Sequence, residues 1–199
     1  IATQNTKFAM PESGIGFFPD VGTSYILSKM NNSIGLYIGL TGKVLNCYEV
    51  YKLGLANHIV ETNKLDMVEN YFMENGNLDI KISDDLNNFQ SKIINNSNLI
   101  NDYFSSMNMP TIIAKLRLDR SEFAFQVMNH LLKRCPISLV VTCEMFKRAK
   151  TMSMKDCLKM DYYLSQVMIK RDDFINGVNE VLIKKTDSPK WQPDSVEKA

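Results

Sequence analysis

The chain has 199 residues, of which 45% are apolar and 23% are charged. This balance is typical of a globular protein with a sizeable core and excludes global disorder. The net charge of +1 gives no reason to expect a nucleic acid or an anionic membrane as the partner, and no apolar run approaches the ~20 residues of a membrane-spanning helix.

Cysteine and histidine usage indicates neither disulfides nor a metal site. The cysteines form no CxxC pair and are expected to be reduced core thiols of an intracellular protein: Cys47, Cys135, Cys143 and Cys157. His58 and His130 are expected to be ordinary packed histidines. With no Cys/His cluster in the sequence, we expect no metal, and nothing in the composition indicates a bound cofactor.

The beginning of the chain is unusual because its first residue is Ile1. Residues 1–11 have an extended pattern and lack the charged and apolar regions of a signal peptide. We interpret the sequence as the later part of a longer protein, with any targeting segment upstream.

Helical patterns follow this extended segment. Asp20 precedes the first one and is expected to be its N-cap, since a carboxylate accepts hydrogen bonds from the free amides of a first turn. A second helix is predicted to stop at Gly42. A third is opened by Asn46 and closed by Gly54, before a short extended piece at residues 55–61.

The rest of the chain divides into two regions. Residues 62–109 are rich in Asn and Asp and have weak periodicity, which indicates loosely packed helices and surface loops. Residues 110–199 are predicted to be mainly helical, in segments 110–118, 121–135, 136–150, 153–170 and 173–185. Pro136 suits a first helical turn, and Ser153 with Asp156 resembles a capping pair. Trp191, which lies in a proline-flanked tail, is expected to be docked.

Residues 8–22, FAMPESGIGFFPDVG, place two carboxylates in an apolar and glycine-rich segment. If Glu12 is buried, desolvation raises its pKa, and it can act as acid, base or nucleophile near neutrality. The alternative is a glutamate that points to solvent from a turn. Asp20 is explained by helix capping alone, although an anion-stabilising helix N-terminus is compatible with chemistry.

The glycines of this segment have the same two interpretations. Gly14, Gly16 and Gly22 allow a close approach of the backbone to a ligand, or they serve only the geometry of turns. The segment lacks the full phosphate-binding fingerprint, and no GxSxG nucleophile elbow occurs in the chain. Residues 8–22 are therefore compatible with one wall of an active site, but they do not identify a reaction.

Residues 8–27, FAMPESGIGFFPDVGTSYIL, resemble the crotonase (enoyl-CoA hydratase/isomerase) superfamily. Within this superfamily the chain is most similar to the family of 3-hydroxyisobutyryl-CoA hydrolases, through the PDVG motif of residues 19–22 and the SPKWQP motif of residues 188–193. The likeness spans nearly the whole chain apart from the Asn-rich middle. It implies an α/β crotonase-like (ClpP/crotonase) spiral fold, here its last ββα turns and a mainly helical C-terminal region.

The resemblance also implies a reaction. It is the hydrolysis of a short β-hydroxyacyl-CoA thioester, most closely 3-hydroxyisobutyryl-CoA in valine breakdown, in which coenzyme A is part of the substrate and no cofactor is needed. Glu12 would activate water or attack the carbonyl, and Asp20 would orient water or the substrate hydroxyl. Gly16 and Phe18 would join these two acids in substrate binding. Mitochondrial localisation and a homo-oligomer are further expectations.

The sequence departs from the family in two respects. Asn179 stands where the family usually has Arg, and the oxyanion-hole amides of the superfamily lie upstream of residue 8. We therefore expect one domain that is the C-terminal portion of a crotonase domain, with residues 1–61 as the active-site part, and an inactive isolated chain whose partner is the missing N-terminal half. A dienoyl-CoA isomerase or hydratase and a non-catalytic scaffold remain alternatives.

Overall fold

The computed structural model describes residues 1–78, 91–186 and 188–199. The chain divides into two compact units, which are described separately below. The first comprises Ile1–Ala9 and Val44–Asn96, and the second comprises Met10–Lys43 and Ser97–Ala199. Part of the Asn-rich middle predicted from the sequence, residues 79–90, lies outside the described residues.

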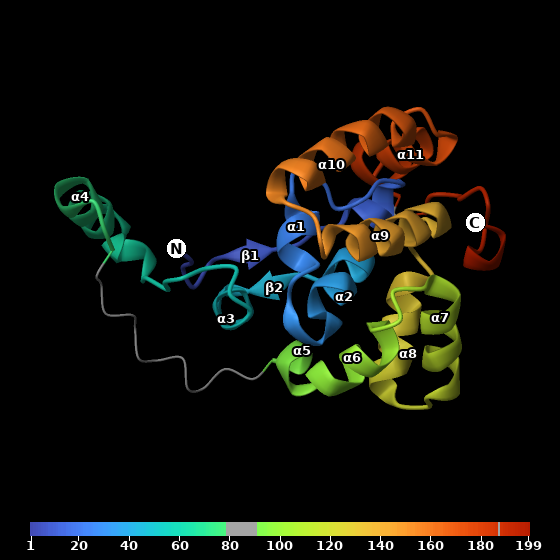
Figure 1. Ribbon diagram of the computed structural model, residues 1–199, viewed down its shortest axis with the longest axis horizontal. Coiled ribbons are helices and arrows are strands. Elements are labelled where there is room, and N and C mark those ends of the chain that lie inside the picture. Colours follow the sequence, from blue (N-terminus) through green and yellow to red (C-terminus); the bar gives the residue numbers. More distant parts are fainter. Residues whose placement is uncertain (79–90, 187) are drawn as a thin grey trace. The chain divides into compact units, whose positions relative to one another are not determined.

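The first unit contains a small antiparallel sheet and helices. Its elements in chain order are β1 (Lys7–Phe8), β2 (Leu45–Asn46), α3 (Cys47–Lys52), a 3-10 turn (Thr62–Lys64), α4 (Leu65–Asn75) and α5 (Lys92–Asn95). The sheet pairs Lys7 with Asn46 and Phe8 with Leu45. An isolated parallel bridge joins Ala2 to Ile59. The extended start predicted for residues 1–11 therefore has only two residues in a regular strand (Figure 1).

Local capping chemistry explains where α3 begins. The Asn46 side chain accepts from the Glu49 amide at 3.0 Å, and the Glu49 carboxylate accepts from the Asn46 amide at 3.0 Å. This reciprocal pair is a capping box, as the position of Asn46 at the start of the predicted helix suggested. Glu49 is buried and also accepts from the Ser91 hydroxyl at 2.5 Å, which ties α3 to the start of α5.

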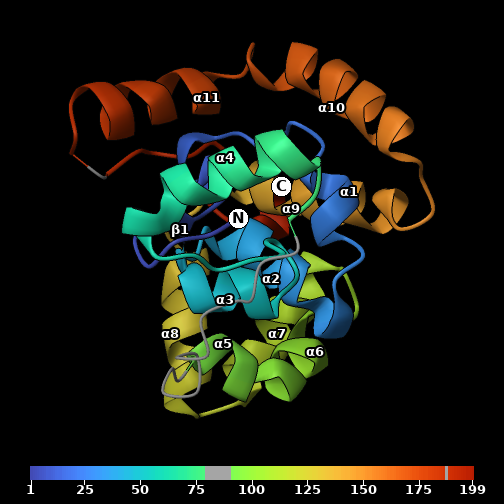
Figure 2. The ribbon, with the colours of Figure 1, turned by 90° about the vertical axis from the view of Figure 1, so that its left-hand side faces the viewer.

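The second unit is helical. Its elements in chain order are the 3-10 turn η1 (Glu12–Ile15), α1 (Thr23–Leu27), a 3-10 turn (Asn31–Ser33), α2 (Ile34–Thr41), α6 (Ser97–Phe104), α7 (Met109–Leu118), α8 (Glu122–Leu131), α9 (Pro136–Ala149), α10 (Met154–Met168), α11 (Asp172–Gly177), a π-helix (Val178–Ile183) and a 3-10 turn (Val196–Lys198). Helices α7 and α8 pack side by side (Figures 1 and 2).

Helix α2 lies at the centre of this unit. All eight of its residues are buried, and it contacts α1, α6, α8 and α9. Such burial on every side is typical of a core helix, which has no amphipathic pattern of its own. Gly42 ends it with a left-handed φ of 64°, as predicted from the sequence.

The later helices confirm most of the predicted boundaries. Pro136 occupies the first turn of α9, and the Ser153 side chain caps α10 by accepting from the Asp156 amide at 3.2 Å. The segment predicted as one helix at 173–185 instead changes from α11 to a π-helix at Val178. All four cysteines are free and buried, which agrees with the predicted reduced core thiols. In the described parts of the chain, no helix has the length and apolar character needed to cross a membrane.

Candidate active site

Glu12 opens the short 3-10 turn that follows Pro11. The Gly14 amide donates to the Pro11 carbonyl at 2.8 Å, and the Phe17 amide donates to the Glu12 carbonyl at 3.0 Å. Gly16 ends the turn with a left-handed φ of 77°, a conformation that costs little only for glycine. We call residues 12–16 the Glu12 turn.

Three helices hold the Glu12 turn, one through the Ser13 side chain and two through backbone atoms of the turn. The Ser13 hydroxyl donates to the Leu40 carbonyl of α2 at 3.0 Å, and the Cys135 amide, at the start of α9, donates to the Ser13 carbonyl at 2.9 Å. Helix α11 approaches so closely that a Cβ placed on Gly16 would lie 2.6 Å from the Asp173 carbonyl oxygen, and one on Gly177 would lie 2.4 Å from the Ile15 carbonyl oxygen. Two glycines therefore permit direct contact between the turn and α11.

The Glu12 carboxyl is half-buried. Burial raises its pKa, a hydrogen bond with its own backbone opposes the rise, and the charge of Asp20 adds to it. One carboxyl oxygen, Oε2, is buried and has no hydrogen-bond partner within the described residues. A carboxyl in this state holds its proton at higher pH than an exposed one and is a stronger base once ionised.

Asp20 is half-buried, and burial raises the pKa of its carboxyl against the lowering effect of its own backbone amide. The prediction that its side chain caps the first helix is wrong. Helix α1 begins at Thr23 with Gly22 as the N-cap residue and no side-chain cap. The Thr23 amide donates instead to the Asp20 backbone carbonyl at 3.0 Å. The carboxyl of Asp20 is therefore not engaged in capping.

The acid that reaches the start of α1 is Asp161 of α10. Its Oδ2 accepts from the Gly22 amide at 2.7 Å, and its Oδ1 accepts from the Ser24 hydroxyl at 3.4 Å. Desolvation raises the pKa of Asp161, the Gly22 hydrogen bond lowers it, and the nearby charge of Asp20 raises it further. Sequence reasoning missed this residue because it lies 139 positions beyond Gly22; its position in an otherwise amphipathic helix was the one available signal.

The two other residues predicted to bind substrate are packed into the unit. Phe18 has no exposed surface, and its ring stacks on Phe17 with centroids 4.4 Å apart. Phe17 in turn contacts Phe174 of α11 at 5.3 Å. Gly16 is buried against Asp173. Any contact with a ligand at Gly16 or Phe18 would therefore come from the backbone.

The two histidines of the sequence lie in different units. His130 is half-buried, and burial together with the neighbouring charges of Lys43, Arg134 and Lys133 lowers its pKa. His58 lies in the other unit and donates no side-chain hydrogen bond that the structure records. Among the residues that the structure describes, no group of three or more His, Cys, Asp or Glu side chains is placed to hold a metal ion.

The fold and the pair of carboxyls define a class of protein. Residues 1–199 match the family model for enoyl-CoA hydratase/isomerase, and the chain belongs to that family. The crystal structure of a carnitinyl-CoA dehydratase from Mycobacterium thermoresistibile matches with a TM-score of 0.86 at 30% identity, over 99% of this chain and 57% of that chain. An enoyl-CoA hydratase from Rhodobacter sphaeroides 2.4.1 has a TM-score of 0.88 at 23% identity, over the same shares. The predicted crotonase fold is confirmed.

Curated relatives point to a narrower group. The chain is 36% identical over 209 residues to the 3-hydroxyisobutyryl-CoA hydrolase, mitochondrial, of Xenopus laevis, covering 99% of this chain and 54% of that protein. It is 38% identical to the protein of the same name in Gallus gallus and 35% identical to that in Homo sapiens. The predicted resemblance to this group is confirmed. The chain spans about half the length of the curated relatives it matches.

Proposed function

We propose that the complete protein carrying this chain hydrolyses 3-hydroxyisobutyryl-CoA to 3-hydroxyisobutyrate and coenzyme A. The observation that carries the proposal is the pair of half-buried carboxyls, Glu12 and Asp20, each with a raised pKa and each within one short segment of the second unit. The names of the curated relatives support the choice of substrate. Their names also support a mitochondrial location, and the proposal includes the role in valine breakdown that the family resemblance implies.

The chemistry assigned to Glu12 follows from its burial. As a general base, its carboxylate takes a proton from water while the water oxygen bonds to the thioester carbonyl carbon; the C–S bond then breaks, and the sulfur leaves as thiolate and takes a proton. As a nucleophile, the carboxylate itself bonds to that carbon, expels the thiolate and is released from the resulting anhydride by water. Raised basicity favours both routes.

Asp20 is assigned to the substrate hydroxyl or to the attacking water. Its carboxyl is free of capping and remains half-exposed, so it can accept a hydrogen bond from either. A site that bonds a substrate hydroxyl discriminates strongly against analogues that lack it, because its polar group is then left unpaired. No cofactor is required by this scheme, and coenzyme A enters as part of the substrate.

The test is release of free coenzyme A, followed with a thiol reagent, from the complete protein and 3-hydroxyisobutyryl-CoA. Rapid release from this substrate and far slower release from acetyl-CoA is the expected result. No thiol release combined with an absorbance change of a dienoyl-CoA would indicate an isomerase instead. Inactivity toward both would favour a non-catalytic scaffold.

A single-turnover experiment in water labelled with oxygen-18 separates the two routes. A nucleophilic Glu12 forms an anhydride, and attack of water on the Glu12 carbonyl of that anhydride places labelled oxygen in Glu12, which peptide mass analysis detects, and unlabelled oxygen in the first product. A general base never labels Glu12, so label in Glu12 identifies the nucleophilic route; label in the product alone is the result of a general base or of water attack on the substrate carbonyl of the anhydride.

A further inference from the structure

Residues 20–22, here called the Asp20 turn, are held by a contact from a distant helix. The Gly22 amide donates to Asp161 Oδ2 at 2.7 Å, and Ser24 donates to Oδ1 at 3.4 Å. Asp161 is only 6% exposed and lies on α10, which packs against α1 (Figure 1). Both oxygens of this buried carboxyl therefore accept hydrogen bonds from residues two and four positions after Asp20.

The backbone of the Asp20 turn is in a conformation that local sequence does not favour. Val21 has a φ of 52° and Gly22 a φ of 79°. A β-branched residue at positive φ is an outlier, and such residues persist only where the surroundings over-determine them. Val21 is 73% exposed, so side-chain packing does not explain its conformation. The Gly22 amide bonded to Asp161 is the neighbouring anchor.

Helix α10 also reaches the turn sterically. A Cβ placed on Gly22 would lie 2.9 Å from Met154 Sδ and 3.2 Å from a terminal carbon of Leu158. Close packing along α10 therefore brings Met154, Leu158 and Asp161, each about one helical turn from the next, toward the Asp20 turn. The packing of Met154 and Leu158 brings α10 close to Gly22, and the Asp161 carboxylate adds a directional hydrogen bond to the Gly22 amide.

We infer that Asp161 is the positioning residue of Asp20: by holding the Gly22 amide, it fixes the strained turn that presents the Asp20 carboxyl. An ionised acceptor forms a stronger and more directional hydrogen bond than a neutral one. Asp161 accepts the hydrogen bond of the Gly22 amide at the start of α1. The Asp20 carboxyl does not cap this helix and is therefore available to a ligand. The identity of that ligand, a β-hydroxyl group, rests on the proposed function.

If this inference is right, removing the Asp161 side chain weakens the discrimination between substrates with and without the β-hydroxyl. A misplaced Asp20 loses its bond to the substrate hydroxyl, and a displacement of about 1 Å can reduce a rate by on the order of 10²-fold. The thioester of an analogue without the hydroxyl does not depend on that bond. The ratio of kcat/KM for 3-hydroxyisobutyryl-CoA to that for isobutyryl-CoA should therefore fall, whereas a general loss of stability would lower both values together.

The experiment compares variants of the complete protein. Asp161→Ala removes the acceptor and is expected to lower the ratio at least about 10-fold. Asp161→Asn keeps a carbonyl oxygen able to accept from Gly22 and is expected to retain most of the ratio. Ser153→Ala removes the cap of the same helix but keeps the Asp161 acceptor of the Gly22 amide, and its ratio should equal that of the wild type. Asp20→Asn combined with Asp161→Ala should be no worse in this ratio than Asp20→Asn alone, because both changes remove one bond.

Amide hydrogen exchange at Gly22 tests the contact independently of catalysis. Faster exchange in Asp161→Ala, but not in Ser153→Ala, supports the inference, and unchanged exchange overturns it. Faster exchange with an unchanged ratio also overturns it, since Asp161 would then be only a structural anchor. If the wild-type protein releases no coenzyme A from either substrate, the proposed function fails, and the exchange result alone decides whether Asp161 fixes the turn.

Discussion

The two acid-bearing turns of the second unit are held in different ways. The Glu12 turn is fixed by three helices: the Ser13 hydroxyl donates to α2, the Cys135 amide at the start of α9 donates to the Ser13 carbonyl, and α11 contacts Gly16 and Ile15 directly. The Asp20 turn is fixed chiefly by one side chain, the carboxyl of Asp161. The Glu12 carboxyl is therefore supported by several contacts, most of them between backbone atoms, whereas the long-range hydrogen bond to the Asp20 turn comes from one ionisable side chain.

This difference separates two kinds of preorganisation. Backbone contacts through glycine are insensitive to pH and to most neighbouring substitutions, but they fail when a Cβ is added. A carboxylate clamp is directional and strong, yet one substitution removes it. The group expected to do the bond-making chemistry, Glu12, lies on the turn that is contacted by three helices, and the group expected to recognise a hydroxyl lies on the other.

The largest expected effect comes from removing the chemistry while leaving both supports in place. Glu12→Gln preserves the size and turn geometry of residue 12 but cannot take a proton or attack a carbonyl. We expect kcat of the complete protein to fall by at least ~10²-fold, the usual contribution of a positioned acid or base. Glu69→Gln, which changes an exposed glutamate of α4, is the control. If Glu12→Gln retained kcat, Glu12 would not be catalytic and would be an ordinary glutamate in a turn.

A glycine substitution tests the backbone support of the Glu12 turn. Gly16 and Gly54 have nearly equal φ values, 77° and 75°, but only Gly16 has backbone atoms within 3 Å of the added Cβ; nothing lies within 4 Å at Gly54. Gly54→Ala should cost about 1–2 kcal/mol of conformational strain, and Gly16→Ala should cost about 1–3 kcal/mol more because of overpacking. Chemical denaturation measures both. Equal losses would show that α11 does not press on the turn.

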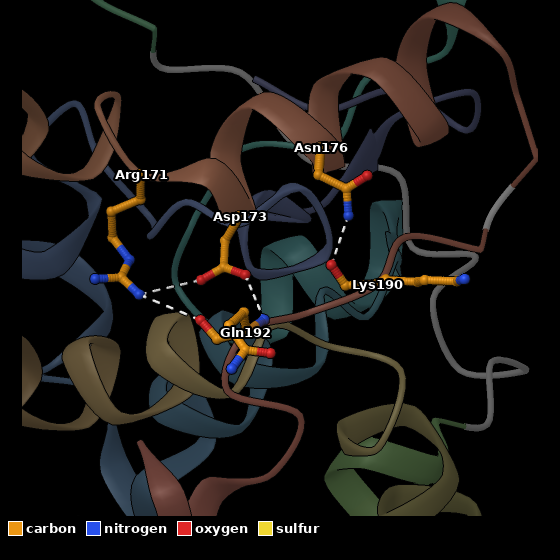
Figure 3. Close-up of polar contacts among 5 residues, drawn as sticks. All are labelled: Arg171, Asp173, Asn176, Lys190 and Gln192. Carbon is orange, nitrogen blue, oxygen red and sulfur yellow. Dashed lines mark hydrogen bonds and ion pairs between the residues drawn. The ribbon is translucent and has the colours of Figure 1, made fainter.

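The C-terminal tail offers a smaller perturbation of the same support. Asp173 is 3% exposed and accepts from the Gln192 amide at 2.8 Å and from Arg171 at 3.2 Å; Arg171 also donates to the Gln192 carbonyl, and Asn176 donates to that of Lys190 (Figure 3). These contacts place the tail along α11, which also meets the Glu12 turn at Asp173 and Gly177.

Asp173→Ala should therefore lower the free energy of unfolding by about 1–3 kcal/mol, as expected when a buried partner is removed. Trp191, the single tryptophan, donates its indole N–H to the Lys133 carbonyl at 3.4 Å and reports on the tail. Its emission should be blue-shifted from that of free tryptophan in the wild type and move toward it in Asp173→Ala. Asp194→Ala, at an exposed position paired with Lys198, should leave the emission unchanged. A wild-type spectrum like that of free tryptophan would contradict a docked tail.

The smallest effect is a change in the pH dependence of stability. Burial raises the pKa of Glu12, so the folded protein keeps this proton after the unfolded chain has released it. The associated stability is complete below the unfolded pKa of about 4.3 and is lost as the pH rises through the folded pKa. Glu12→Gln removes this loss, so its free energy of unfolding should decline less than that of the wild type from pH 4 upward. Parallel profiles, matching those of Glu69→Gln, would contradict burial of the Glu12 carboxyl.

Several local features could be predicted from the sequence. The helix boundaries at Asn46, Gly42, Pro136 and Ser153 depend on hydrogen bonds within a few residues or on the φ of one residue. Such short-range interactions can be predicted because the residues involved are neighbours in the sequence. The apolar residues around Glu12 left open whether it is buried or points to solvent; in the structure it is half-buried, and burial raises its pKa. The family resemblance rested on motifs in the same short segments.

Other features were decided only when distant segments met. By itself, the sequence determined where most helices begin and end and which segment carries the two acids, because those properties depend on neighbours along the chain. It assigned the cap of α1 to Asp20, whereas the tertiary structure brought Asp161 to Gly22 across 139 positions. Likewise, the close fits of Gly16 against Asp173 and of Gly177 against Ile15 exist only between packed elements. A carboxylate can satisfy any amide within reach, and only the packing of α10 and α11 decides which amides those are.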